Sequence, residues 1–131
     1  MSLYYHDTSA LAKLVVAEAE SSALRALMVE AVNVSSDLAR TELVRAVRRS
    51  APERVPLAHD VLSALDLVGL TPELMDVAGR LEPDALRSLD AVHVAAALTL
   101  GEELDALVTY DDRMAQAATR LGLHVLAPGR D

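Results

Sequence analysis

The chain has 131 residues, a length typical of one domain, and no linker or low-complexity tract divides it, so we expect a single domain over residues 1–131. It contains no cysteine, which excludes disulfides and thiolate metal sites, and its net charge of -8 argues against a protein that binds nucleic acid through a broad basic surface. Hydrophobic residues make up 52% of the chain, yet Phe and Trp are absent, so Ala, Val and Leu must build the core.

No segment predicts secretion or membrane insertion. The N-terminus lacks a basic region followed by an apolar one, as a signal peptide would have. The longest uncharged stretch, near Ala91–Gly101, is also far shorter than the roughly 20 residues that a membrane-spanning helix needs. We therefore expect a soluble, cytoplasmic protein without membrane association.

Strands and helices alternate from the N-terminus onward. The apolar run at residues 3–5 predicts a first strand, and apolar residues at helical spacing predict helices over residues 10–16 and 21–30. Residues 32–35 predict a second strand. A third helix follows over residues 38–49, with Ser36 or Asp37 as its cap, and Pro52 and Pro56 are expected to break the chain after it.

The second half of the chain continues this alternation. Thr71, Pro72 and Glu73 form a typical helix start, and Pro83 is expected to end that helix. The remaining predicted elements are an amphipathic segment at 57–68, a strand at 68–70, helices at 86–98 and 112–121, and strands at 106–110 and 124–128. This order predicts an α/β fold, a three-layer α/β/α sandwich with a mostly parallel sheet of four to five strands.

Four acidic residues fall at or near the carboxyl ends of the predicted strands. Asp7 and Asp111 follow strands directly, and Glu42 lies in the second turn of the helix after the second strand. Asp90 lies in the first turn of the helix that leads into strand 106–110. Because ligands of open α/β sheets bind outside the carboxyl ends of the strands, we expect these four acids to meet at one edge.

Each acid also has a local structural explanation. The two acids that follow strands can cap the next helix, and Asp90 can complement the dipole of its own helix. Glu42 can pair with Arg45 or Arg49 on the same helix. The sequence alone leaves these explanations open for each acid taken singly.

Four converging carboxylates would need a counter-charge. Two of them about 6 Å apart repel by roughly 3 kcal/mol at an effective dielectric of about 20. Mg²⁺ or Mn²⁺ suits a site made of oxygen ligands, whereas zinc would require Cys or paired His ligands. A metal held by carboxylates favours hydrolysis of phosphate esters by an activated water, and Thr8, Ser9 and Thr109 are within reach of the site to position water or phosphate.

Four blocks of the sequence resemble those of PIN-domain nucleases, in particular the VapC toxins of bacterial toxin–antitoxin systems. They are "YYHDTSALAKLV", "SDLARTELVRAV", "LRSLDAVHVAAAL" and "ALVTYDDRMAQAATRLGLHVLAPG". The resemblance implies a PIN-like fold and an Mg²⁺ site made by Asp7, Glu42, Asp90 and Asp111. It also implies metal-dependent cleavage of RNA to 5′-phosphate and 3′-hydroxyl ends. A homodimer and a small antitoxin that covers the cleft are expected as well.

Several neighbouring residues are interpreted alongside this site. We favour Asp111 over Asp112 as the fourth acid because it stands third in "TYD". His93 is interpreted as a packing residue, and so is His6, which points to the opposite side of its strand. Arg87 and Arg113 flank the site and could contact RNA phosphates or form surface salt bridges.

Three alternatives to the toxin hypothesis remain at this point. A PIN nuclease for RNA maturation would have the same site and differ in its genomic context. A phosphorelay receiver domain has a similar size and an acidic Mg²⁺ pocket, but it needs a Lys after its last strand, where this chain has Pro128-Gly129-Arg130. A non-catalytic binding module would be expected to lack one or more of the acids, all of which are present.

Overall fold

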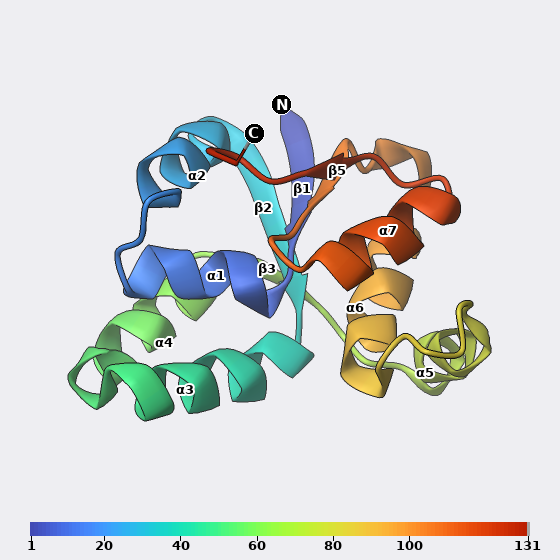
Figure 1. Ribbon diagram of the computed structural model, residues 1–131, viewed down its shortest axis with the longest axis horizontal. Coiled ribbons are helices and arrows are strands. Elements are labelled where there is room, and N and C mark those ends of the chain that lie inside the picture. The colour runs from blue at the N-terminus through green and yellow to red at the C-terminus, as the bar shows by residue number, and fades with distance from the viewer. Residues whose placement is uncertain (131) are drawn as a thin grey trace.

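A parallel sheet of five strands forms the centre of the protein in the computed structural model, which describes residues 1–130 (Figure 1). The strand order is β3-β2-β1-β4-β5, and every pairing is parallel. The strands are β1 (Ser2–His6), β2 (Ala31–Ser36), β3 (Asp66–Val68), β4 (Ala106–Val108) and β5 (Val125–Leu126). This order differs from the 2-1-3-4-5 order of flavodoxin-like sheets, so the receiver-domain alternative is wrong.

Helices cover both faces of the sheet, which confirms the predicted three-layer α/β/α sandwich. One group packs on one side and the other on the opposite side, as Figure 1 shows. The first group is α1 (Thr8–Val15), α2 (Ser21–Met28), α3 (Leu38–Ser50) and α4 (Val55–Ser63). The second group is α5 (Pro72–Arg80), α6 (Ser88–Leu98) and α7 (Asp112–Arg120).

The alternation of side chains along the strands divides the core in two. Tyr5 on β1 and Leu107 on β4 pack with α5, α6 and α7, while Val108 packs with α1 and α2 on the other face. Helix α6 is buried over the unbroken run Ala91–Ala97. A helix that is apolar on all sides must lie inside the protein, and four of these seven residues are alanines small enough to allow close approach to the sheet.

Two predictions from the sequence were wrong in detail. The third strand covers Asp66–Val68 instead of residues 68–70, because it is an edge strand that tolerates an exposed Asp66 and ends before Gly69. Pro56 does not break the chain. It lies in the first turn of α4, where proline is tolerated because the backbone N–H there has no helical partner.

The connections between elements bring several helix N-termini to one edge of the sheet. Helices α1 and α7 begin within four residues of the ends of β1 and β4. The N–H of Asp7 donates to the carbonyl of Val108, which holds the ends of the two central strands together. Within residues 1–130, no helix combines the length and the apolar character needed to cross a bilayer.

Candidate active site

Asp7 is a buried carboxylate surrounded by hydrogen-bond donors. It caps α1, and its Oδ1 accepts from the N–H of Ala10 at 3.0 Å and from the Ser9 hydroxyl at 2.7 Å. The Thr109 hydroxyl donates to Oδ2. Burial raises the pKa of Asp7, and the bonds from Thr109, Ser9 and Ala10 oppose that rise. Ser9 and Thr109 therefore contact Asp7 directly, and their predicted role in positioning water or phosphate stays a prediction.

Glu42 is held by a buried chain of polar groups. Its Oε1 accepts from the Thr8 hydroxyl at 2.7 Å and from Nε2 of His93 at 2.6 Å. The hydroxyl of Tyr5 lies 2.8 Å from Nδ1 of the same ring. Because a carboxylate only accepts, Nε2 of His93 carries a hydrogen and donates it to Glu42.

The electrostatics of this chain follow from its burial. Burial alone would raise the pKa of Glu42, but the hydrogen bonds from His93 and Thr8 bring it below its usual value. Burial raises the pKa of Tyr5 well above its usual value, so this hydroxyl stays protonated. The hydrogen bonds from His93 and Thr8 thus favour the ionised form of Glu42 although it is partly buried.

The interpretation of His93 as a packing residue was incomplete. The ring does pack, edge to face, against Tyr5, but it also bonds directly to one of the four acids. A polar ring that is 1% exposed must have hydrogen-bond partners. The sequence carried this signal, since the histidine stands in an otherwise apolar helix one turn after Asp90.

Asp90 and Asp111 share one arginine. Nε of Arg87 lies 3.0 Å from Oδ2 of Asp90, and Nη2 lies 3.3 Å from Oδ2 of Asp111. The other oxygen of Asp111 caps α7 by accepting from the N–H of Met114 at 3.0 Å. Of the two interpretations of Arg87, the structure therefore shows the salt bridge. The Arg87 guanidinium therefore supplies part of the counter-charge that was expected from Mg²⁺ or Mn²⁺ alone.

Polar contacts join three of the four acids, and Glu42 belongs to a second network that Thr8 brings beside the first. Thr109 donates to Asp7 and accepts from the N–H of Asp111 at 3.1 Å. Thr8, the residue after Asp7, binds Glu42. Within residues 1–130, however, no three His, Asp or Glu side chains converge closely enough to form a metal-ligand group. The carboxylates lie at one edge of the sheet in two neighbouring networks, and their role as metal ligands stays a prediction.

The donor set nevertheless fits a hard divalent cation. All four acids offer oxygen ligands, which Mg²⁺ and Mn²⁺ prefer. In the part of the chain that the structure describes, Oε2 of Glu42 and Oδ1 of Asp90 accept no hydrogen bond. These two oxygens are available to a ligand without breaking any contact, whereas Asp111 would exchange Arg87 for the cation.

The structure distinguishes the other charged residues that were considered beside the four acids. Asp112 is 87% exposed and lies 3.5 Å from Arg130, so Asp111 is the member of the pair that joins the network. Glu42 does not pair with the arginines further along α3. Arg113 is exposed and forms no ion pair within residues 1–130, which leaves it available to a ligand.

The surroundings of His6 agree with its interpretation as a packing residue. It is fully buried, and its Nε2 donates to Oδ1 of Asn33 at 2.9 Å. Burial lowers its pKa to about 4, so the ring is neutral at pH 7. It makes no hydrogen bond to any of the four acids.

Comparisons with known proteins agree with this architecture. The family model of the PIN domain matches residues 4–120. The chain is 45% identical to "Ribonuclease VapC46" of Mycobacterium tuberculosis, covering 98% of this chain and 99% of that protein. It is 41% identical to "Ribonuclease VapC35" of the same organism, with 98% of each chain covered.

Solved structures show the same fold at low sequence identity. The crystal structure of VapC20 from Mycobacterium tuberculosis, described as a sarcin-ricin loop cleaving toxin, has a TM-score of 0.71 at 18% identity. The match covers 87% of this chain and 94% of the VapC20 chain. VapBC2 from Rickettsia felis, bound to a DNA fragment from its promoter, has a TM-score of 0.70 at 16% identity, with 95% and 97% covered.

Proposed function

The chain belongs to the PIN-domain family and is a ribonuclease of the VapC type, and we propose that it hydrolyses RNA with a divalent cation held by Asp7, Glu42, Asp90 and Asp111. The observation that carries this proposal is the polar network that joins Asp7, Asp111 and Asp90 at the carboxyl ends of the central strands. Glu42 is bonded beside it to Thr8, the residue after Asp7. Mg²⁺ or Mn²⁺ fits the all-oxygen donor set.

When bound, such an ion supplies Lewis-acid activation of a water and stabilises charge on the phosphate. The protein's own residues provide the positioning. Ser9 and Thr109 fix the two oxygens of Asp7, and His93 and Thr8 fix one oxygen of Glu42 so that its other oxygen stays free. Such outer hydrogen bonds orient ligands and sharpen the geometry of a metal site.

Positive groups near the acids support an RNA substrate. Arg113 is unpaired within residues 1–130, and Arg45, Arg48 and Arg49 line a hollow further along α3, the helix that carries Glu42. In a protein of net charge -8, RNA needs such local cations to approach the acidic edge.

The toxin role extends this activity to partners. The two relatives that are 45% and 41% identical to this chain are named VapC, and one solved structure with the same fold is a VapBC assembly. We infer that this chain works as the toxin of a toxin–antitoxin pair, with a small antitoxin covering the acidic edge, and that it forms a homodimer. A PIN nuclease for RNA maturation is the alternative, and growth arrest on expression, relieved by a protein encoded beside it, would separate the two.

Cleavage of single-stranded RNA by the purified chain tests the proposed mechanism. We expect activity with Mg²⁺ or Mn²⁺, none with EDTA, and a loss of about 10²-fold or more in Asp7→Asn and Asp90→Asn. Asp112→Asn is the matched control, because this exposed acid adjoins the site without joining its network. Activity that survives EDTA and both substitutions would overturn the metal-dependent mechanism.

A further inference from the structure

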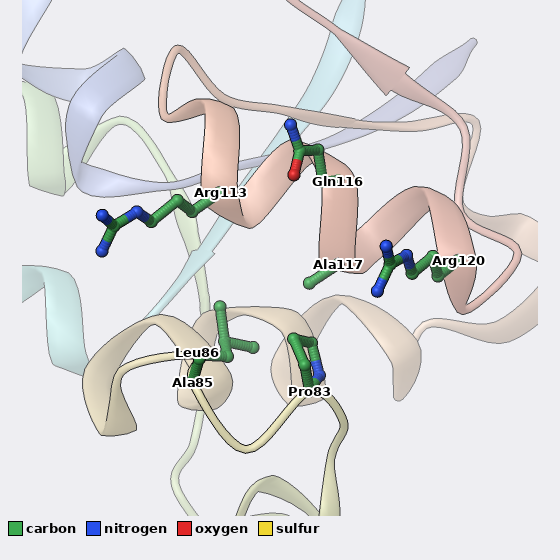
Figure 2. A pocket seen from close by; sticks show the side chains of 7 residues that line it. All are labelled: Pro83, Ala85, Leu86, Arg113, Gln116, Ala117 and Arg120. Carbon is green, nitrogen blue, oxygen red and sulfur yellow. The ribbon is translucent and has the colours of Figure 1, made fainter.

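A groove beside the acids has no role in the mechanism so far. It runs between the segment that precedes α6 and the adjacent face of α7, and its volume is about 330 Å³ (Figure 2). We call it the α7 groove. Its lining residues are Pro83, Ala85, Leu86, Arg113, Gln116, Ala117 and Arg120.

The α7 groove adjoins the exposed part of the acidic edge. Leu86 immediately precedes Arg87, which binds Asp90 and Asp111. At the other wall, Arg113 follows Asp111 by two residues on the same helix. A molecule that lies across the carboxylates can therefore continue into the groove without leaving the surface of the protein.

The groove combines an apolar floor with two cationic ends. In Figure 2, Leu86 and Pro83 point from the lower segment toward α7, and Ala117 points down toward them. Arg113 and Arg120 lie at opposite ends of the helix face, seven residues or roughly 10 Å apart along the axis. Both are exposed, and neither forms an ion pair in residues 1–130.

This combination matches the parts of one unpaired nucleotide. RNA-binding proteins recognise unstacked bases on apolar or planar side chains, and guanidinium groups bind phosphates bidentately or stack on bases. A volume near 330 Å³ lies at the lower end of the range for small-ligand pockets. An apolar peptide would leave both arginines without anionic partners, so the groove favours an anionic ligand with a flat apolar part.

We propose that the α7 groove binds one unpaired nucleotide of the RNA substrate, adjacent to the phosphate that is cleaved. The base lies on the floor made by Leu86 and Ala117, and Arg113 and Arg120 contact the flanking phosphates. This inference rests on the proposed ribonuclease function and adds a recognition site to it, because the groove would favour substrates with an unpaired base at one fixed position.

Binding of labelled single-stranded RNA pentamers in EDTA tests the groove without cleavage. We expect the double variant Arg113→Gln/Arg120→Gln to weaken the Kd by about tenfold and to reduce the salt dependence of binding by about one or two counterions. Arg25→Gln with Arg80→Gln is the control, since it removes the same charge from α2 and α5. Thermal melting of every variant checks that the fold is retained.

Pentamers with an abasic site at each position in turn test the base contact. For the wild type we expect one position at which loss of the base weakens binding several-fold. In Leu86→Ala that dependence disappears while the salt dependence is unchanged, because only the floor is altered. Leu57→Ala, an exposed leucine on α4, is the control for the loss of apolar surface.

The outcomes separate this inference from the proposed function. Wild-type affinity, salt dependence and abasic profile in the groove variants would overturn the nucleotide site even if the chain cleaves RNA. Loss of binding to a partner protein by the double variant, with RNA binding unchanged, would identify a protein-docking groove and also overturn it. A wild type that neither binds nor cleaves RNA would overturn the proposed function itself.

Discussion

Asp7 and Asp111 occupy equivalent places in the chain and differ in what surrounds them. Each follows a central strand, and each caps the next helix by accepting from an N–H three residues on, at 3.0 Å. Asp7 is 2% exposed and its second oxygen is bound by Thr109, whereas the Asp111 side chain is 25% exposed and its second oxygen is bound by Arg87.

The difference shows that the local motif fixes where a carboxylate lies, and that tertiary burial decides how its charge is compensated. Neutral hydroxyls and a backbone N–H hold Asp7 in a fixed position but leave its charge without a cationic partner. A solvent-exposed guanidinium holds Asp111 and Asp90 and neutralises them. Asp7 is thus fixed by neutral donors, whereas Asp90 and Asp111 are held by a guanidinium that another cation can replace.

The largest expected effect separates activity from stability at Asp7. Because burial raises its pKa, the folded protein holds this proton more tightly than the unfolded chain does. The stabilising contribution of the protonated group is complete below the unfolded pKa of about 3.9 and is lost as pH rises through the raised folded value. We expect Asp7→Asn to lose cleavage by about 10²-fold or more and, without metal, to be more stable than the wild type at pH 7.

The free energy of unfolding, measured with urea in EDTA from pH 4 to pH 8, tests this expectation. Asp111→Asn is the matched control, because Asp111 caps a helix as Asp7 does. That variant keeps an N-cap residue but loses its contact with Arg87, so we expect it to be no more stable than the wild type. If Asp7→Asn is the less stable of the two at pH 7, the buried carboxylate is compensated after all and the contrast fails.

The second prediction concerns Glu42, the acid that His93 holds. His93→Phe keeps the packing against Tyr5 but removes the donor to Glu42, so we expect cleavage to fall by about 10- to 100-fold and the affinity for Mg²⁺ to weaken with it. His93→Gln can still donate from its amide and should recover part of both. His124→Gln, at an exposed histidine, is the control.

Equal loss in the Phe and Gln variants, with the Mg²⁺ affinity unchanged in both, would show that His93 only packs. The affinity can be measured by the rise in melting temperature with Mg²⁺ concentration, because an ion that binds only the folded state stabilises it by mass action. This readout would not change if the ring merely filled space.

Much of the fold and the position of the acids could be predicted because both depend on short-range signals. Strand–Asp–helix segments identify Asp7 and Asp111, and alternating elements place the acids at one edge. Contacts across long stretches of chain could not be predicted. The bond between His93 and Glu42 joins residues 51 apart, and the one between Arg87 and Asp111 joins residues 24 apart. Such pairs exist only after α6 has packed into the core.

The smallest expected effect tests the two acids that Arg87 holds. Arg87 occupies the space between Asp90 and Asp111 and must release Asp111 when a cation takes its place. We expect Arg87→Gln to bind Mg²⁺ about two- to fivefold more tightly, because the cation no longer competes with Arg87 for the carboxylates. The effect is small because an exposed ion pair contributes little free energy. The difference should shrink as salt screens the guanidinium, and Arg80→Gln should show no change.

The same substitution also tests what the released arginine does. A guanidinium displaced from Asp111 stays beside the scissile phosphate and can bind it, so Arg87→Gln should raise the KM for RNA although it binds Mg²⁺ more tightly. Tighter Mg²⁺ binding together with a higher KM for RNA would mean that Arg87 leaves the carboxylates and binds the substrate when the cation binds. If Mg²⁺ binding weakens instead, Arg87 holds Asp90 and Asp111 in place as firmly as Thr109 holds Asp7, and the contrast between Asp7 and Asp111 fails.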